Sequence, residues 1–352
     1  MDLPTTAPMP QPLLRPKFRP SRPRLRRGHG AIWFAAILLS SFLTPPSSSW
    51  GKEGAKNAVY QSLVDPDPAD PSPIRLGKAR FHSGQSPQQQ LDELNRAGRP
   101  KYDAEALLRP AVVAPHLFTL SREPLGQMDA STQHARVVFA LRGAIETLAK
   151  DDFLNQLFVA SEDEEGAGSV AKGASDPQGT NDSRPLSDAE LNAAGIDPTR
   201  LGGEKGQPED GKSDRKGGES YRLVRGELFS KVRISGVVHG EWTTDQDSIL
   251  LAMRFDNRFA DHPALKGTWE RLERDDQGGL KVVQRGDWAG GGAYVRLTRC
   301  LTEPDRVICE AELGWVEPKP WFGGANLIGS KLPPVIQSQV REIRRAAIRQ
   351  AN

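Results

Sequence analysis

The stretch Ser248-Ile-Leu-Leu-Ala-Met-Arg-Phe255 decides the fold class, because large apolar residues occupy every second position in it. Ile249, Leu251, Met253 and Phe255 alternate with their neighbours, which predicts a β-strand with one face buried in a core. Similar runs lie on both sides of this stretch, and turn-forming Asp and Gly residues separate them. The sequence therefore predicts several antiparallel strands in one or two curved sheets.

These strands belong to a domain over residues 221–352, which closes on a helix. From Pro333-Pro334 onward, Ile336, Val340, Ile343 and Ala347 fall on one helical stripe, and arginines fall elsewhere. Such a helix can lie across the sheet or on an anionic membrane surface, and the narrow stripe favours the sheet. The predicted fold class is α+β: a curved antiparallel sheet with a long C-terminal helix packed on it, preceded by largely disordered regions.

Two cysteines, Cys300 and Cys309, lie in the last predicted hairpin. A two-residue turn centred on Pro304-Asp305 sets these cysteines opposite each other. Opposed cross-strand side chains have Cβ atoms roughly 4.5–5.5 Å apart, so modest adjustment could join them. In an exported protein, this arrangement predicts a disulfide, whereas two free thiols are the alternative for a cytosolic chain.

The N-terminus predicts export. Residues 1–30 carry seven Arg or Lys against one Asp, and residues 31–43 form an uncharged apolar run of thirteen. That run suits a signal peptide over residues 1–49 and is shorter than the roughly 20 residues of a membrane-spanning helix. The alternatives are an uncleaved anchor at 31–43, which would contact a membrane, and a plastid transit peptide. From Gly51 the chain has a net charge of −4, which argues against nucleic-acid binding.

The region before the main domain divides into three parts. Residues 50–85 read as an extended linker, because proline takes nearly every second position from Pro66 to Pro73. Residues 86–160 read as a small α or β-α segment: Ser86 begins a capping-box helix, and 136–150 reads as a strand and helix or as one helix. Residues 161–220 have no aromatic residue and eleven glycines, which predicts a disordered spacer, with one short capped helix at Ser187.

Few residues suggest chemistry. Trp288, Trp321 and Phe322 lie close to glycines and could rim a binding cavity, although packing of strand ends is the favoured account. His239 and His262 lack the partners of known catalytic motifs, so no catalytic residue, metal ligand or cofactor is assigned.

The order of elements in residues 221–352 resembles that of the START-like, polyketide-cyclase/coenzyme-Q-binding helix-grip domains. The resemblance rests on strands from Val237-Val238 to Phe255, then Gly267-Thr-Trp-Glu-Arg-Leu272, Gly279-Leu-Lys-Val-Val283 and the helix after Leu332-Pro-Pro. It implies a curved sheet that grips the C-terminal helix, with an apolar ligand between them. It implies no universal catalytic residues.

Three functions follow as hypotheses. The first is an exported, non-enzymatic module that binds a lipid or other apolar small molecule between sheet and helix. The second is a cell-envelope interaction protein without a small ligand. The third is a cyclase- or hydrolase-like enzyme that uses His239 or His262, which requires one of these histidines beside a carboxylate at the cavity wall.

Overall fold

The computed structural model describes residues 57–126, 129–149, 153, 182–201, 217–323 and 325–351. Its helices, 3-10 turns (η) and strands follow in chain order: α2 (Ala58–Val64), α3 (Pro87–Gly98), α4 (Ala104–Leu108), β1 (Leu117–Pro124), β2 (Ala130–Arg142), α5 (Ile145–Leu148), β3 (Asp182–Pro185), α7 (Asp188–Ala193), η3 (Pro198–Arg200), β4 (Gly217–Leu228), β5 (Val232–Thr244), β6 (Ser248–Phe255), η4 (Asn257–Phe259), β7 (Thr268–Arg274), β8 (Leu280–Asp287), β9 (Gly291–Arg299), β10 (Arg306–Pro318), η5 (Lys319–Trp321) and α8 (Leu327–Ala351).

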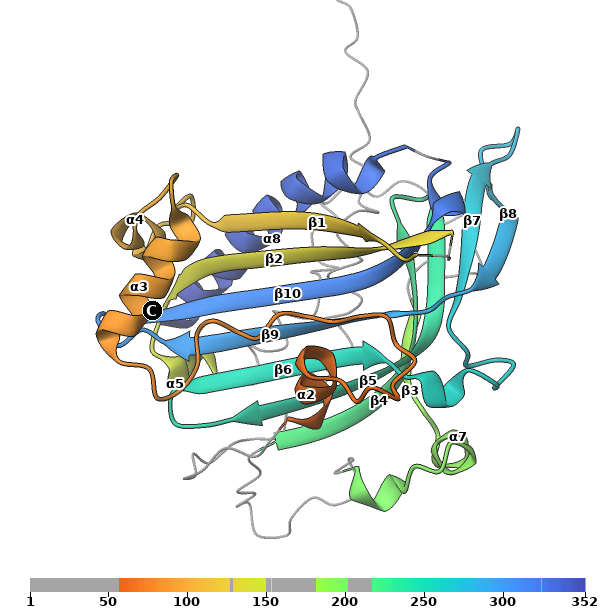
Figure 1. Ribbon diagram of the computed structural model, residues 1–352, viewed down its shortest axis with the longest axis horizontal. Coiled ribbons are helices and arrows are strands. Elements are labelled where there is room, and N and C mark those ends of the chain that lie inside the picture. The colour runs from red at the N-terminus through yellow and green to blue at the C-terminus, as the bar shows by residue number, and fades with distance from the viewer. Residues whose placement is uncertain are drawn as a thin grey trace, which may run out of the picture.

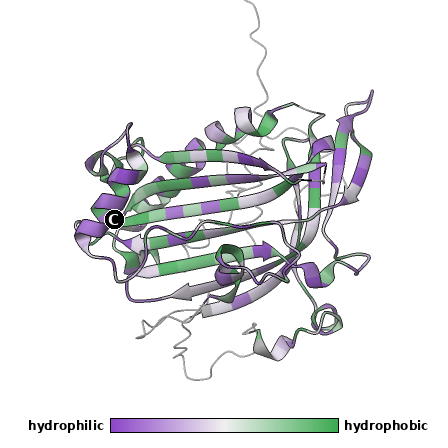
Figure 2. Cartoon of the chain, viewed as in Figure 1, coloured by the Kyte–Doolittle hydropathy of each residue, from purple (hydrophilic) through white to green (hydrophobic). Residues whose placement is uncertain are grey.

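One antiparallel sheet organises the fold. Its strands follow the order β1-β2-β10-β9-β6-β5-β4-β3, and the β7–β8 hairpin branches from β5. Figure 1 shows α8 behind this sheet and α2 in front of it. Figure 2 shows apolar residues along the central strands and hydrophilic residues on the β7–β8 hairpin. The predicted class, an antiparallel sheet with a long C-terminal helix packed on it, is confirmed.

The segment before the main domain supplies part of the sheet. Strand β2 covers the ambiguous residues after Arg136 and pairs along its whole length with β10. Residues 182–201, expected to be spacer, also carry structure, because β3 pairs with β4 and Leu191 is buried. The capping boxes predicted at Ser86 and Ser187 are both confirmed. The rest of the predicted spacer and residues 1–56 lie outside the described residues.

The sheet has an inner face toward α8 and an outer face toward α2, and β10 shows the difference most clearly. Cys309, Ala311 and Leu313 point inward, whereas Glu310 and Glu312 point outward to the chain that follows α2. Successive side chains of a strand point to opposite faces, so this one strand serves an apolar and a charged layer at once.

The outer face is covered by residues 65–86, which we call the strap. The strap is extended as its prolines predict, but it is not a free linker, because Ile74, Leu76 and Phe81 are buried in it. Two glycines paired in register, Gly292 on β9 and Gly314 on β10, make the close approach possible. A Cβ at Gly292 would lie 2.4 Å from the Leu63 side chain, and one at Gly314 would lie 2.7 Å from Leu76.

Buried carboxylates hold the strap in place. Glu310 Oε2 accepts hydrogen bonds from the backbone N–H of Arg80 at 2.7 Å and of Phe81 at 3.3 Å. Glu312 Oε1 accepts one from the Gly77 N–H at 3.0 Å, and Glu312 also pairs with Arg136. An extended chain that joins no sheet needs such acceptors for its N–H groups. Burial raises the pKa of Glu310, and Arg136 opposes that shift.

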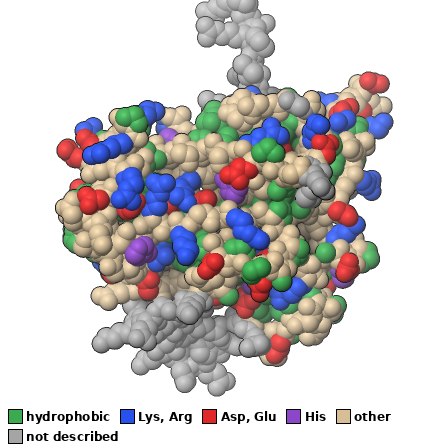
Figure 3. All heavy atoms as spheres, in the orientation of Figure 1, with side chains coloured by type: hydrophobic (Ala, Val, Ile, Leu, Met, Phe, Trp, Pro, Cys, Tyr) green, Lys and Arg blue, Asp and Glu red, His purple; other side chains and the backbone are tan. Residues whose placement is uncertain are grey.

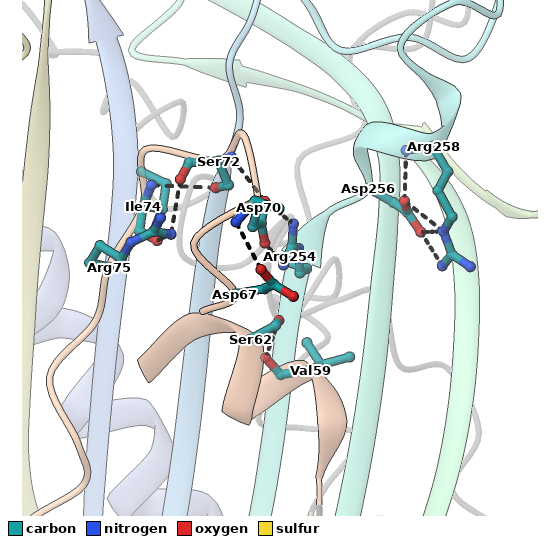
Figure 4. A network of polar contacts seen from close by, with 11 residues as sticks. Val59, Ser62, Asp67, Asp70, Ser72, Ile74, Arg75, Arg254, Asp256 and Arg258 are labelled. Carbon is teal, nitrogen blue, oxygen red and sulfur yellow. Dashed lines mark hydrogen bonds and ion pairs between the residues drawn. The ribbon is translucent and has the colours of Figure 1, made fainter. Parts of the chain in front are cut away.

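A second ion pair fixes the start of the strap. Arg254 on β6 donates to both Asp70 carboxylate oxygens, at 2.7 and 3.2 Å, and Figure 4 shows this contact beneath the strap. Asp70 Oδ1 also accepts the Ser72 N–H at 2.9 Å, so one side chain shapes the strap and ties it to the sheet.

Helix α8 differs in two ways from its prediction. It begins at Leu327, so Pro333 and Pro334 lie inside the helix rather than at its start. Asn326 provides the start signal, because its Oδ1 accepts the Gly329 N–H. Arg344, expected off the apolar stripe, is buried and donates to the backbone carbonyls of Ala140, Ala114 and Pro115. Burial lowers its pKa to about 10.

Replacing Glu310 with Ala will loosen the strap. The change leaves two strap N–H groups without their acceptor and removes a carboxylate near Arg136, at a cost of about 2–4 kcal/mol in the free energy of unfolding. Urea unfolding measures the cost, and limited proteolysis should cut the variant within the strap. Glu105→Ala, at an exposed site on α4, is the control. Equal stability and protection in both variants would contradict this role of Glu310.

Candidate functional site

The inner face of the sheet is almost wholly apolar across five strands. The following inward-facing residues, from β2, β9, β6 and β5, are all buried in one hydrophobic cluster: Val137, Phe139, Leu141, Ala293, Val295, Leu297, Ile249, Leu251, Met253, Val238 and Trp242. The alternation of Ile249, Leu251 and Met253 that predicts the fold also builds this surface. It is the broadest candidate for contact with an apolar molecule in the described part of the chain.

Helix α8 faces this surface with an apolar stripe of its own. Its buried side chains include Ile328, Leu332, Ile336 and Val340, and the helix packs mainly on β2. Ile336, Val340 and Ala347 are three of the stripe residues predicted from the sequence, and all are buried. Ile343, the fourth, is only partly buried.

Ala311 is the exception in the lining. It lies in the middle of β10 on the inner face, with Val137 of β2 and Val295 of β9 in register on either side. Both valines are buried, yet Ala311 is partly exposed. A side chain in the centre of a sheet is exposed only where the covering layer leaves open space above it. The Ala311 side chain is therefore less completely covered than its neighbours in the sheet.

An aromatic cluster closes one end of the inner face. Trp288 stacks edge-on against Phe255 with ring centroids 4.5 Å apart, and Trp321 lies 5.9 Å from Trp288 and 6.1 Å from Phe322. The three aromatic residues singled out in the sequence thus come together. Trp288 and Trp321 are buried rather than exposed at a rim, and only Phe322 is partly exposed. The Trp321 indole Nε1 is buried and has no hydrogen-bond partner in the described residues.

A polar pair lies on the inner face near the same end of β10. Gln133 of β2 donates through Nε2 to Glu317 Oε2 at 2.5 Å, and both side chains are buried. The Arg122 guanidinium lies 3.8 Å from the other Glu317 oxygen and is mostly exposed. Burial raises the pKa of Glu317, while Arg122 and Gln133 act in the opposite direction. Neither Gln133 nor Glu317 belongs to a motif, so the sequence contains no signal for this pair.

The predicted Cys300–Cys309 disulfide is wrong. Both thiols are free and buried, and Cys309 lies opposite Leu297. The turn is centred on Glu303 rather than on Pro304-Asp305: the Cys300 N–H donates to Arg306 O, and the Arg306 N–H donates to Glu303 O. The observed pairing of β9 with β10 is therefore shifted by three residues from the predicted one. An odd shift exchanges the two faces of a strand, so Cys309 lies on the inner face.

Cys300 lies in a different cluster. It packs with Phe81, Val138 and Ile308, which belong to the outer side of the sheet. The two thiols are therefore on opposite faces and cannot meet without breaking the hairpin register.

His239 has a carboxylate neighbour, but on the wrong face for the inner site. Its Nε2 lies 2.7 Å from Glu219 Oε1, its ring stacks on Tyr221 at 4.3 Å, and the Tyr221 hydroxyl donates to the same carboxylate. The contact with His239 holds the pKa of Glu219 down at about 2. This cluster packs β4 against β5 and η4 on the outer side. His262 lies in the turn after η4 and does not join it.

Neither a metal centre nor a membrane span is found where the structure is described. In those ranges, no group of three His, Cys, Asp or Glu side chains could hold a metal ion. No described helix is both long and apolar enough to cross a membrane. The apolar run at 31–43 and the predicted signal peptide at 1–49 lie outside the described residues.

Comparisons with known proteins give a likeness of fold alone. No family model and no curated protein matches the chain. Among solved structures, the crystal structure of human STARD10 is similar over 77% of this chain and 83% of that one, at 9% sequence identity and a TM-score of 0.29. The expected antiparallel sheet with its C-terminal helix is present, and β1, β2 and β3 are added to the sheet from outside residues 221–352.

The free thiols predict that reductant will not change stability. A disulfide closing this short hairpin would contribute about 2–3 kcal/mol, whereas two free thiols contribute no such constraint. The free energy of urea unfolding should be the same with and without dithiothreitol. Intact mass after alkylation of the unfolded chain without reductant should show two modified cysteines. A mass lower by the two thiol hydrogens, with no alkylation, would contradict the assignment.

We expect the natural chain and the variant Glu317→Gln to differ in stability by an amount that depends on pH. Because burial raises the pKa of Glu317, the folded state binds its proton more tightly than the unfolded state. The resulting stability is present below the ordinary glutamate pKa of 4.5 and is lost as pH rises through the raised value.

Glutamine has no proton to lose, so the variant should gain stability relative to the natural chain as pH rises from 4.5 through the raised pKa of Glu317. Urea unfolding of both proteins across this range measures the difference between their free energies of unfolding. The titration of all other groups is common to both proteins and cancels in this difference. A difference that does not change with pH would show that Glu317 titrates alike in both states.

Proposed function

We propose that the chain is a non-enzymatic module that binds an apolar small molecule of the lipid type between the inner face of the sheet and α8. The observation that carries the proposal is Ala311, which is partly exposed at the centre of an otherwise buried apolar face. Open space lined by apolar side chains is occupied favourably by an apolar ligand, at roughly 25 cal/mol for each Å² removed from water.

The breadth of the inner face supports the proposal. A helix with its side chains is about 10–12 Å wide, and neighbouring strands lie about 4.8 Å apart. Helix α8 packs mainly on β2, while the apolar surface continues through β10, β9 and β6 to β5, four strands away. The inward apolar side chains, all of them buried except Ala311, therefore continue well beyond the strip that α8 alone can cover. An elongated apolar molecule suits such a surface.

The polar groups at one end of the face suggest a ligand with one polar end. Gln133 and Glu317 can exchange hydrogen bonds with a hydroxyl, and the unpartnered Trp321 Nε1 can donate one to an oxygen. Export of the module is a separate part of the proposal and rests only on the apolar run at 31–43.

A variant with a large side chain on the inner face tests the proposed ligand binding. Ala311→Phe places a large ring in the open space and should abolish binding of cis-parinaric acid, a fluorescent fatty acid, with little change in fold. Ala130→Phe is the matched control, because Ala130 is also partly buried but lies on β2 with its side chain toward the outer face. The control should bind the probe as the natural chain does.

Native mass spectrometry of the natural chain, followed by solvent extraction, should find a co-purified apolar molecule that Ala311→Phe lacks. No probe binding together with no co-purified molecule would refute the proposed function. Loss of binding in both variants would place the site elsewhere. Circular dichroism of each variant separates loss of the site from loss of the fold.

A further inference from the structure

The strap is basic after Pro71. Between Pro71 and Leu91 the chain has no Asp or Glu, but it has Arg75, Lys78 and Arg80. Arg75 and Lys78 are exposed and Arg80 is partly exposed, while Ile74, Leu76 and Phe81 point down to the sheet. The strap therefore presents its cations to solvent and its apolar side chains to the core.

The carboxylates beneath this row are already engaged, and the exposed acids of the strap, Asp65 and Asp67, lie before it at the start of the strap. Asp70 is paired with Arg254, Glu312 with Arg136, and Glu310 accepts the strap N–H groups. The Arg75 guanidinium hydrogen-bonds only to the carbonyls of Ser72 and Ile74, as Figure 4 shows. Within the described ranges, Lys78 has no ion pair. Figure 3 shows Lys and Arg side chains gathered on this face.

We propose that this row of cations, Arg75, Lys78 and Arg80, docks the outer face on an anionic phospholipid bilayer. Arg75 and Lys78 are exposed in a stretch without acids, and the anions beneath that stretch are buried or paired, which favours contact with an anionic surface. No exposed aromatic side chain accompanies the row, since Phe81 is buried, so it lacks the stacking platform that single-stranded nucleic acids require. A flat anionic surface needs only the charges.

The course of the chain fits a membrane on this side. The apolar run ends at Leu43, and the chain enters the described domain at α2 on the outer face, beginning at Ala58. Fourteen residues lie between these two points, and the connection can span up to about 50 Å. Any membrane contact made by the N-terminal segment therefore brings a bilayer within reach of the strap. This docking is independent of the ligand proposed for the inner face.

The test uses the full chain and co-sedimentation with vesicles of phosphatidylcholine containing phosphatidylserine. Each basic residue near an anionic surface strengthens partitioning by about fivefold. The double variant Arg75→Gln, Lys78→Gln should thus lose about 25-fold in partitioning at low salt. The control Lys281→Gln, Arg285→Gln removes the same charge from exposed positions on β8 and should change partitioning by less than about twofold.

Each result decides the proposal. A selective loss in the strap variant that disappears at high salt, with no loss toward pure phosphatidylcholine, supports it. Equal losses of partitioning in both variants overturn it in favour of net charge. No loss in either variant overturns it in favour of the basic N-terminus. A strap variant that loses binding to a single-stranded oligonucleotide but keeps its vesicle binding identifies a nucleic-acid surface instead. Urea unfolding confirms that both variants fold.

Discussion

The alternation of side chains along β10 is the constraint on which the structure depends. Its inward positions, Cys309, Ala311 and Leu313, belong to an apolar layer, and its outward positions, Glu310 and Glu312, belong to a charged one. A strand can serve two such layers only if its register is correct, since a one-residue slip exchanges the faces. A pairing with Cys300 opposite Cys309 would turn both glutamates toward the apolar side. The cost of burying two carboxylates there excludes it.

The outward glutamates explain why a proline-rich segment is part of the domain. Prolines keep the strap extended and remove several of its N–H groups, and the remaining ones need acceptors to be buried. Glu310 and Glu312 provide those acceptors from more than 200 positions further along the chain. With its N–H groups satisfied beneath it, the strap can bury Ile74, Leu76 and Phe81 and still expose its cations. The charge pattern of the outer face thus follows from how the strap is anchored.

Features that depend on neighbouring residues could be read from the sequence. The period-two pattern at Ile249–Phe255 and the capping boxes at Ser86 and Ser187 act within a few residues, so their local structures were predictable. The strap and the hairpin register depend on contacts between distant residues or on turn geometry. A turn centred on Glu303 instead of Pro304-Asp305 changes every pair in the hairpin, and composition does not distinguish the two. Arg344 can be buried because four backbone carbonyls accept hydrogen bonds from its guanidinium, and helical periodicity does not reveal these contacts.

In the candidate site, too, some features could be predicted from neighbouring residues and others depend on distant contacts. Its apolar lining could be expected from the strands, and the aromatic residues at its end attract attention in the sequence. Its two informative residues could not be found that way. Ala311 differs from its neighbours only in being partly exposed where Val137 and Val295 are buried, and its residue type alone does not single it out. Glu317 forms its buried hydrogen bond with Gln133, which lies 184 positions away in the sequence. A small side chain at the centre of the inner face and a buried polar pair at its edge together favour a ligand that is apolar along its length and polar at one end.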